Sequence, residues 1–234
     1  MLGIRGMRTW YNQAQHETRQ SGHKMLIEDV PVRNLREYLQ GMVNMRKKYA
    51  REHGKPKGWH YLCHEDLLLQ HGKFYVSQPL TPEELAAVKS IGSMSNYKQQ
   101  LCFYNAQKIA TTYMKFAYVE GVAWASGIPI PMSHAWNTIN DKVVDVTWKH
   151  MNSGEPILGK FPKDMEYCGV PVSVKSIHKL WGKTGNAYSI LDFPINVHLF
   201  KRKFDPDAPE QIPQEFFDEY ARDKTNSKNW SDKS

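Results

Sequence analysis

The chain has 234 residues, enough for one domain with an added subdomain and a sizeable core. Its 41% apolar and 12% aromatic residues exclude a disordered chain, and it has no run of about 18–20 apolar residues that would span a membrane. The net charge is +7, and the polar N-terminal region lacks the apolar segment of a signal peptide.

Helix patterns dominate the first part of the chain. Apolar residues recur at helical spacing over 31–52, and a glycine and a proline stop the pattern directly afterwards. Residues 59–72 indicate a second, shorter helix, and residues 81–90 begin with a Thr-Pro-Glu-Glu capping box that predicts a third. Residues 91–97 are rich in Gly and Ser and indicate a loop. We therefore expect a helical N-terminal subdomain over 1–90.

Strand patterns follow one further helix, which the spacing predicts over 100–116. Strand-like runs cover 117–124, 133–139 and 142–148. The last two are separated by Asn140-Asp141, a hairpin turn that makes their strands antiparallel.

The end of the chain is less regular. Short strands are expected at 170–176 and 188–200, with a turn at 182–185 between them. We expect the core domain to cover 91–204, and 205–234 to form a charged, partly flexible tail. The order of elements predicts an α+β fold in which one helix packs against an antiparallel sheet.

The positive charge is concentrated at the N-terminal end. Residues 1–60 carry twelve Lys/Arg against five Asp/Glu. This asymmetry has two explanations. Residues 33–57 either bind an acidic partner or nucleic acid, or they form an ordinary solvated helix face. The basic residues that would make such contacts are Arg46, Lys47, Lys48 and Arg51.

The three cysteines, Cys63, Cys102 and Cys168, are too few and odd in number for a disulfide framework. They favour a reducing, cytoplasmic compartment, in which a cysteine is available for chemistry. The compact length and an N-terminal region without a recognised motif would suit a bacterial or phage accessory protein.

A thiol nucleophile needs a base beside it and a group that orients the base. Cys102 lies directly after a loop, in the first turn of a predicted helix, where the helix dipole favours a thiolate. His134 and Asp145 lie on the two strands of the predicted hairpin, at positions within diagonal reach of each other. Each residue also has a structural explanation, since buried cysteines and histidines are common and an acid in an apolar strand can pair in the core. Together, the three predict a Cys-His-Asp triad.

The motif residues also carry a family resemblance. They are Cys102, Tyr118-Val119-Glu120-Gly121, His134-Ala135-Trp136 and Val144-Asp145-Val146-Thr147-Trp148. This pattern resembles the transglutaminase-like superfamily over residues 95–150, although the Gly-x-Cys-Trp of animal transglutaminases is missing. The resemblance implies a papain-like core with Cys102 as nucleophile, His134 as general base and Asp145 as orienting residue.

Other side chains are candidates for the substrate site. Gln99 or Gln100 could donate an amide N–H to an oxyanion, although surface glutamines are common on helices. Glu120 and Trp136 would line a substrate cleft, or would instead lie in an ion pair and in the core. His60, Cys63, His64 and His71 form a cluster, but its spacing fits no familiar zinc site, so we expect no metal.

The sequence therefore predicts an enzyme that needs no cofactor, since no phosphate-binding or dinucleotide-binding motif is present. It would attack an amide or acyl bond of a protein, peptide or small amide through an acyl-enzyme at Cys102. Hydrolysis is favoured slightly over transfer to an amine. The alternative is a non-catalytic fold that binds nucleic acid or a protein through its basic N-terminal helix.

Overall fold

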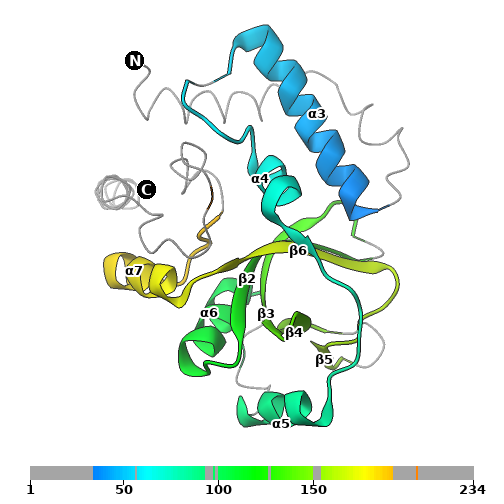
Figure 1. Ribbon diagram of the computed structural model, residues 1–234, viewed down its shortest axis with the longest axis vertical. Coiled ribbons are helices and arrows are strands. Elements are labelled where there is room, and N and C mark those ends of the chain that lie inside the picture. The colour runs from blue at the N-terminus through cyan, green and yellow to red at the C-terminus, as the bar shows by residue number, and fades with distance from the viewer. Residues whose placement is uncertain are drawn as a thin grey trace, which may run out of the picture.

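A computed structural model describes residues 34–55, 57–92, 97, 100–125, 128–149, 154–191 and 204 (Figure 1). Its centre is a six-stranded antiparallel sheet in the order β1-β6-β2-β3-β4-β5. The strands are β1 (Lys73–Phe74), β2 (Ala117–Ala125), β3 (Met132–Ile139), β4 (Lys142–Lys149), β5 (Pro156–Leu158) and β6 (Met165–Val172). The described residues contain five helices, so the predicted α+β class is confirmed.

The β3–β4 hairpin forms where the turn residues predict it. Asn140 and Asp141 have φ angles of 47° and 65°, the left-handed conformation that tight hairpin turns require. The two strands pair only from Asn137–Ile139 to Lys142–Val144. Beyond this short ladder the structure gives β3 and β4 no further pairing.

The first helices have the ends that their sequences predict. Helix α3 (Leu35–His53) is capped by the side chain of Asn34 and ends at Gly54, whose φ of 84° reverses the chain. Helix α4 (His64–His71) is shorter than the 59–72 expected. Helix α5 (Pro82–Ser90) has the predicted capping box, with both of its hydrogen bonds present.

The later helices differ more from expectation. Helix α6 (Cys102–Thr112) begins two residues later and ends four residues earlier than the predicted 100–116. Helix α7 (Val174–Thr184) occupies a region where we expected a strand end and a turn. Ser173 caps its start and Gly185, in the left-handed conformation, ends it, so the glycine taken for a turn at 182 lies inside the helix. Of the strand expected at 170–176, residues 170–172 form the end of β6, and residues 174–176 begin α7.

The sheet separates two apolar clusters. One face carries Tyr118 and Val122 of β2 and packs against α3, α4, α6 and α7. The opposite face carries Val119, Trp136 and Tyr167. A third cluster joins α5 and α6 to β3 and β4. The α6 helix therefore lies on one face of the sheet, between the sheet and solvent.

The described part of residues 1–90 shares the core of the rest of the chain. Strand β1 pairs with β6, and Leu35 and Leu39 of α3 belong to the same cluster as buried residues of α6 and α7. The predicted boundary near residue 90 therefore does not separate two hydrophobic cores. The tail predicted at 205–234, most of the strand predicted at 188–200, and residues 1–33 lie outside the described residues. None of the helices in the described ranges combines the length and apolarity that a bilayer crossing requires.

Candidate active site

The hairpin brings His134 and Asp145 into direct contact. Nε2 of His134 lies 2.6 Å from Oδ2 of Asp145, and the two side chains are only 2% and 1% exposed. The partners are not opposite each other in the ladder; they meet diagonally, beyond its last paired residues. The proximity predicted from the turn is confirmed.

Asp145 is held by more than the histidine. Its Oδ1 accepts hydrogen bonds from the backbone N–H groups of Thr147 and Trp148, at 2.9 and 3.0 Å. Its Oδ2 also accepts one from the Tyr167 hydroxyl on β6, at 3.0 Å. Burial raises the pKa of Tyr167 well above its usual range, so this hydroxyl remains a donor. With four donors around it, the carboxylate has a fixed position from which to orient the imidazole.

Cys102 is the first residue of α6, and its side chain lies close enough to His134 to raise the pKa of the imidazole. The Asn105 side chain donates to the Thr147 hydroxyl at 2.9 Å, which ties the first turn of α6 to β4 beyond the paired part of the hairpin. The helix start thus lies where β3 and β4 are no longer hydrogen-bonded to each other.

The start of α6 is suited to an anion. Its first internal hydrogen bond runs from the backbone N–H of Asn105 to the carbonyl of Leu101, so the N–H groups of residues 102–104 precede the helical ladder. No side chain caps this end, and its first turn contains no acidic residue. An oxyanion formed next to Cys102 would meet the positive end of the helix dipole.

The electrostatics of His134 favour its protonated form. Burial by itself lowers the pKa of this imidazole, but the charge of Asp145, the hydrogen bond to Asp145 and the contact with Cys102 outweigh it and raise the pKa to about 9. At neutral pH the imidazole is therefore charged. It is placed to hold the proton of the thiol and to donate a proton to a leaving group.

The other two cysteines have different surroundings. Cys63 and Cys168 are 3% and 0% exposed. Burial raises the pKa of Cys63 well above its usual range and that of Cys168 to about 12. Both thiols are therefore protonated at neutral pH, which disfavours their reaction as nucleophiles.

Three aromatic rings surround the imidazole. The His134 ring lies 4.8 Å from Trp148, 6.1 Å from Trp136 and 6.4 Å from Tyr167, measured between centroids. The Trp136 ring occupies a slot opposite Gly169, where a Cβ atom would lie 2.6 Å from its Cη2. At 1% exposure Trp136 packs inside the sheet. This corrects the expectation that it lines a cleft, because the strand turns its ring into the core beneath His134.

Glu120 also lies in the interior. It is fully buried, and its carboxylate accepts hydrogen bonds from Tyr118 and Ser189 and from the backbone N–H groups of Ile190 and Leu191. Burial raises its pKa to about 7, against the effect of those four donors. The expected role in a substrate cleft does not fit this position, since β2 directs Glu120 towards α6 and the 189–191 segment rather than towards His134.

The expected oxyanion donors are only partly described. Gln100 lies two residues before Cys102, is exposed and has a φ of 65°, an uncommon conformation for a residue other than glycine. Gln99 lies outside the described residues. Sequence reasoning did not find Asn105 or Tyr167. Asn105 carried a usable signal, because it is a polar residue one turn after the cysteine on the apolar side of the helix.

In the histidine cluster, His71 is paired with a tyrosine. His71 Nε2 lies 2.7 Å from the Tyr61 hydroxyl, which also accepts a hydrogen bond from the Phe204 backbone N–H. In the described parts of the chain, no group of three or more His, Cys, Asp or Glu side chains is placed to hold a metal ion.

Comparisons with family models, with curated proteins and with solved structures gave no match to this chain.

Proposed function

We propose that this protein is a cysteine-dependent enzyme of transglutaminase-like, papain-like type, in which Cys102, His134 and Asp145 form the catalytic triad. The observation that carries the proposal is the 2.6 Å contact of a buried His134 with Asp145, close to Cys102 at the start of α6. The resemblance of residues 95–150 to that superfamily supports the same assignment. A reducing, cytoplasmic location is part of the proposal, because Cys102 has to remain a thiol.

In the proposed reaction, Sγ of Cys102 attacks the carbonyl carbon of an amide or acyl group. The carbonyl oxygen takes up negative charge beside the first N–H groups of α6. His134 then donates its proton to the leaving nitrogen, the C–N bond breaks, and the acyl group remains on sulfur. Water next gives a proton to His134 and attacks the thioester, which releases the acid and restores the thiol–imidazole pair. An amine in place of water would give transfer, and we propose hydrolysis as the main outcome.

Exposed apolar side chains near the triad favour an apolar substrate group. Leu101 precedes the nucleophile and is 43% exposed, Tyr104 lies in the same helical turn and is 40% exposed, and Met132, two residues before His134 on its strand, is 48% exposed. Large exposed apolar groups of this kind are typical of binding surfaces. We therefore propose a peptide or amide substrate with an apolar side chain next to the reacting carbonyl.

The test uses a thiol-reactive acyl electrophile, with the adduct located by mass spectrometry. Wild-type protein is expected to gain one acyl group at Cys102, and Cys102→Ala none. The matched control is the Cys63→Ala, Cys168→Ala double variant, which should label as fast as the wild type because both of these thiols are protonated at neutral pH. Labelling of Cys102→Ala to the wild-type extent would contradict the proposal.

A second variant separates an activated thiol from one that is merely accessible. His134→Ala is expected to label at least about tenfold more slowly, because the thiol loses the group that holds its proton. Unchanged labelling of this variant, with its far-ultraviolet circular dichroism intact, would remove His134 from the mechanism. Product analysis with and without an added primary amine then distinguishes hydrolysis from transfer.

A further inference from the structure

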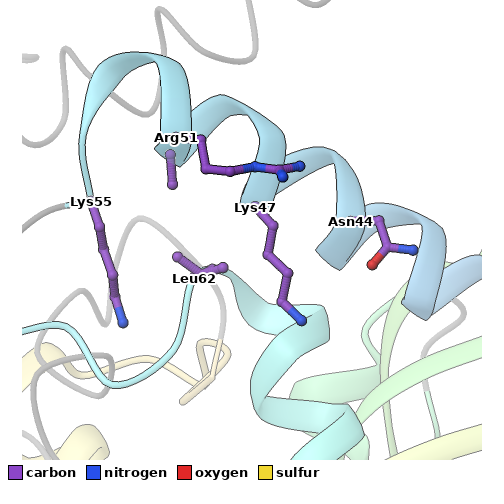
Figure 2. Close-up of a pocket in the computed structure, with 6 residues that line it drawn as sticks. Asn44, Lys47, Arg51, Lys55 and Leu62 are labelled. Atoms are coloured by element: carbon purple, nitrogen blue, oxygen red, sulfur yellow. The ribbon is translucent and has the colours of Figure 1, made fainter.

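A pocket lies on α3, far along the chain from the triad. Its cavity has a volume of about 510 Å³ and is lined by Asn44, Lys47, Ala50, Arg51, Lys55 and Leu62. Figure 2 shows Lys47 and Lys55 on either side of Leu62, with Arg51 on the helix above them. Three of the six lining residues are cationic and none is acidic.

The fold brings these cationic side chains to one pocket. Lys47 and Arg51 are four residues apart on α3 and therefore share one face of the helix. Gly54, with its φ of 84°, turns the chain back after the helix and brings Lys55 to the same side. The side of α3 that carries Leu35, Leu39 and Val43 is buried, so the helix is fixed with its cationic face outwards.

The opposite wall of the pocket is also anchored. Leu62 follows Trp59 and Tyr61, which are 5% and 2% exposed and belong to the main core cluster. The hydroxyl of Tyr61 is bound to His71 and to the backbone of Phe204. Both walls are therefore held by the core, and the pocket exists without a ligand to order it.

The cations are not neutralised within the described part of the chain. None of Lys47, Arg51 and Lys55 makes an ion pair there. Residues 44–57 carry six Lys/Arg and one acid, Glu52. Lys48 and Lys57 are exposed and extend the positive charge beyond the pocket. This is more charge than one small anion requires, and it matches a repeating polyanion.

The chemistry of the surface favours phosphate over a protein partner. Protein interfaces have apolar and aromatic centres and are depleted in lysine. The exposed large apolar side chains of the described structure are Val76, Leu85, Leu101, Tyr104, Met114, Ile130 and Met132, and none lies on α3 or on the segment that closes the pocket. Lysine and arginine are, in contrast, the residues that bind phosphate oxygens.

We propose that the pocket formed by Lys47, Arg51 and Lys55 binds phosphate groups of a nucleic-acid backbone. No aromatic side chain lines it, so bases do not stack there and binding is independent of sequence. This site is separate from the proposed enzymatic function, since α3 packs on α4 and β6 whereas α6 packs on β2, β3 and β4. A Cys102→Ala variant therefore retains it.

The test measures binding of a fluorescein-labelled DNA duplex of mixed sequence to the full chain by fluorescence anisotropy. Wild-type affinity should fall steeply between about 50 and 200 mM salt. The variant Lys47→Gln, Arg51→Gln, Lys55→Gln should bind at least about tenfold more weakly, with a salt slope smaller by about 2 to 3. The control Lys89→Gln, Lys115→Gln, Lys175→Gln removes the same charge from exposed positions elsewhere and should change affinity less than about threefold.

Three outcomes would overturn the proposal. Equal loss of affinity in the two triple variants would mean that only net charge matters. Competition by polyglutamate as effective as that by unlabelled duplex would show a site for acidic protein instead. Displacement of the duplex by inorganic phosphate at equal phosphate concentration would show a site for a single small anion. Both triple variants change exposed side chains, so circular dichroism should show wild-type folding in each.

Discussion

Each face of the central sheet buries one carboxylate, and the two carboxylates have different hydrogen-bond donors. Asp145 lies on the face with Trp136 and Tyr167, and one of its four donors is the protonated His134. Glu120 lies on the α6 face, and its four donors are all neutral. Both are fully enclosed, so burial alone does not distinguish them.

The difference lies in what each acid holds. Asp145 fixes a titratable ring next to a thiol, which is the arrangement that the proposed reaction requires. Glu120 fixes the backbone of Ile190 and Leu191 against β2, which is an arrangement for folding. No described residue forms an ion pair with Glu120, and burial raises its pKa to about 7. A buried acid therefore indicates catalysis only when its partners include a group that can pass on a proton.

The largest predicted effect separates the two acids by activity. Asp145→Asn should lower the rate of acyl labelling at Cys102 by at least about tenfold and by no more than His134→Ala does, because Asp145 acts through His134. The cause is the loss of the charge and geometry that hold His134. Glu120→Gln should leave the rate within about threefold, since Glu120 touches neither His134 nor the reacting group. Equal labelling rates in the two variants would show that Asp145 and Glu120 do not differ in their effect on the reaction.

The next largest effect is a lower free energy of unfolding when Glu120 is substituted. Glu120→Ala leaves the donors of Tyr118, Ser189, Ile190 and Leu191 without their acceptor, which should lower the free energy of unfolding by about 3 kcal/mol. Urea denaturation followed by circular dichroism measures this change. Asp164→Ala, at an exposed position, serves as the control and should change stability by less than about 0.5 kcal/mol.

The pH dependence of stability should show two steps. The pKa of Glu120 rises from 4.5 in the unfolded chain to about 7, so its contribution is complete below 4.5 and is lost as the pH rises through 7. The pKa of His134 rises from 6.5 to about 9, so its contribution is complete below 6.5 and is lost as the pH rises through 9. Each step is worth at most about 3 kcal/mol.

Urea denaturation at a series of pH values measures these steps. Glu120→Gln should remove the lower step, and His134→Gln the upper one. If a variant kept the step assigned to its own residue, that assignment would be wrong.

The smallest effect comes from a matched pair of hydroxyls. Tyr167 donates to Asp145 and Tyr118 donates to Glu120, at 3.0 and 2.8 Å. Tyr167→Phe and Tyr118→Phe should each cost about 1 kcal/mol of stability. Only Tyr167→Phe should also slow acyl labelling, by several-fold, since only that hydroxyl helps to fix the triad. A slower rate in Tyr118→Phe alone would reverse the assignment of the two faces.

Short sequence patterns predicted the hairpin turn and the start of α5, because neighbouring residues determine both. The Asn140-Asp141 turn sets the hairpin register, and the register brings His134 to Asp145. The capping box predicted the start of α5 for the same reason. Helix α7 was missed although Ser173 and Gly185 mark its two ends, because a glycine inside the helix was read as a turn.

The second half of the site depends on contacts that no local pattern encodes. Tyr167 reaches Asp145 from β6, and Glu120 meets Ser189 across 69 residues of chain. Both contacts exist only after β6 has paired with β2 and the segment after α7 has folded back. The sequence predicted His134 beside Asp145 but not the hydroxyl groups of Tyr167 and Ser189 that bind the two acids.

Position 169 has no room for a side chain larger than that of glycine. Gly169 pairs with Gly121 on β2, and the Trp136 ring fills the space where its side chain would be. The same ring is stacked on His134 at 21°. A single methyl group at position 169 would therefore press on the tryptophan and, through it, on the imidazole. Diverged relatives of this protein should be recognisable by a glycine at that place in the strand equivalent to β6, together with a tryptophan two residues after the histidine.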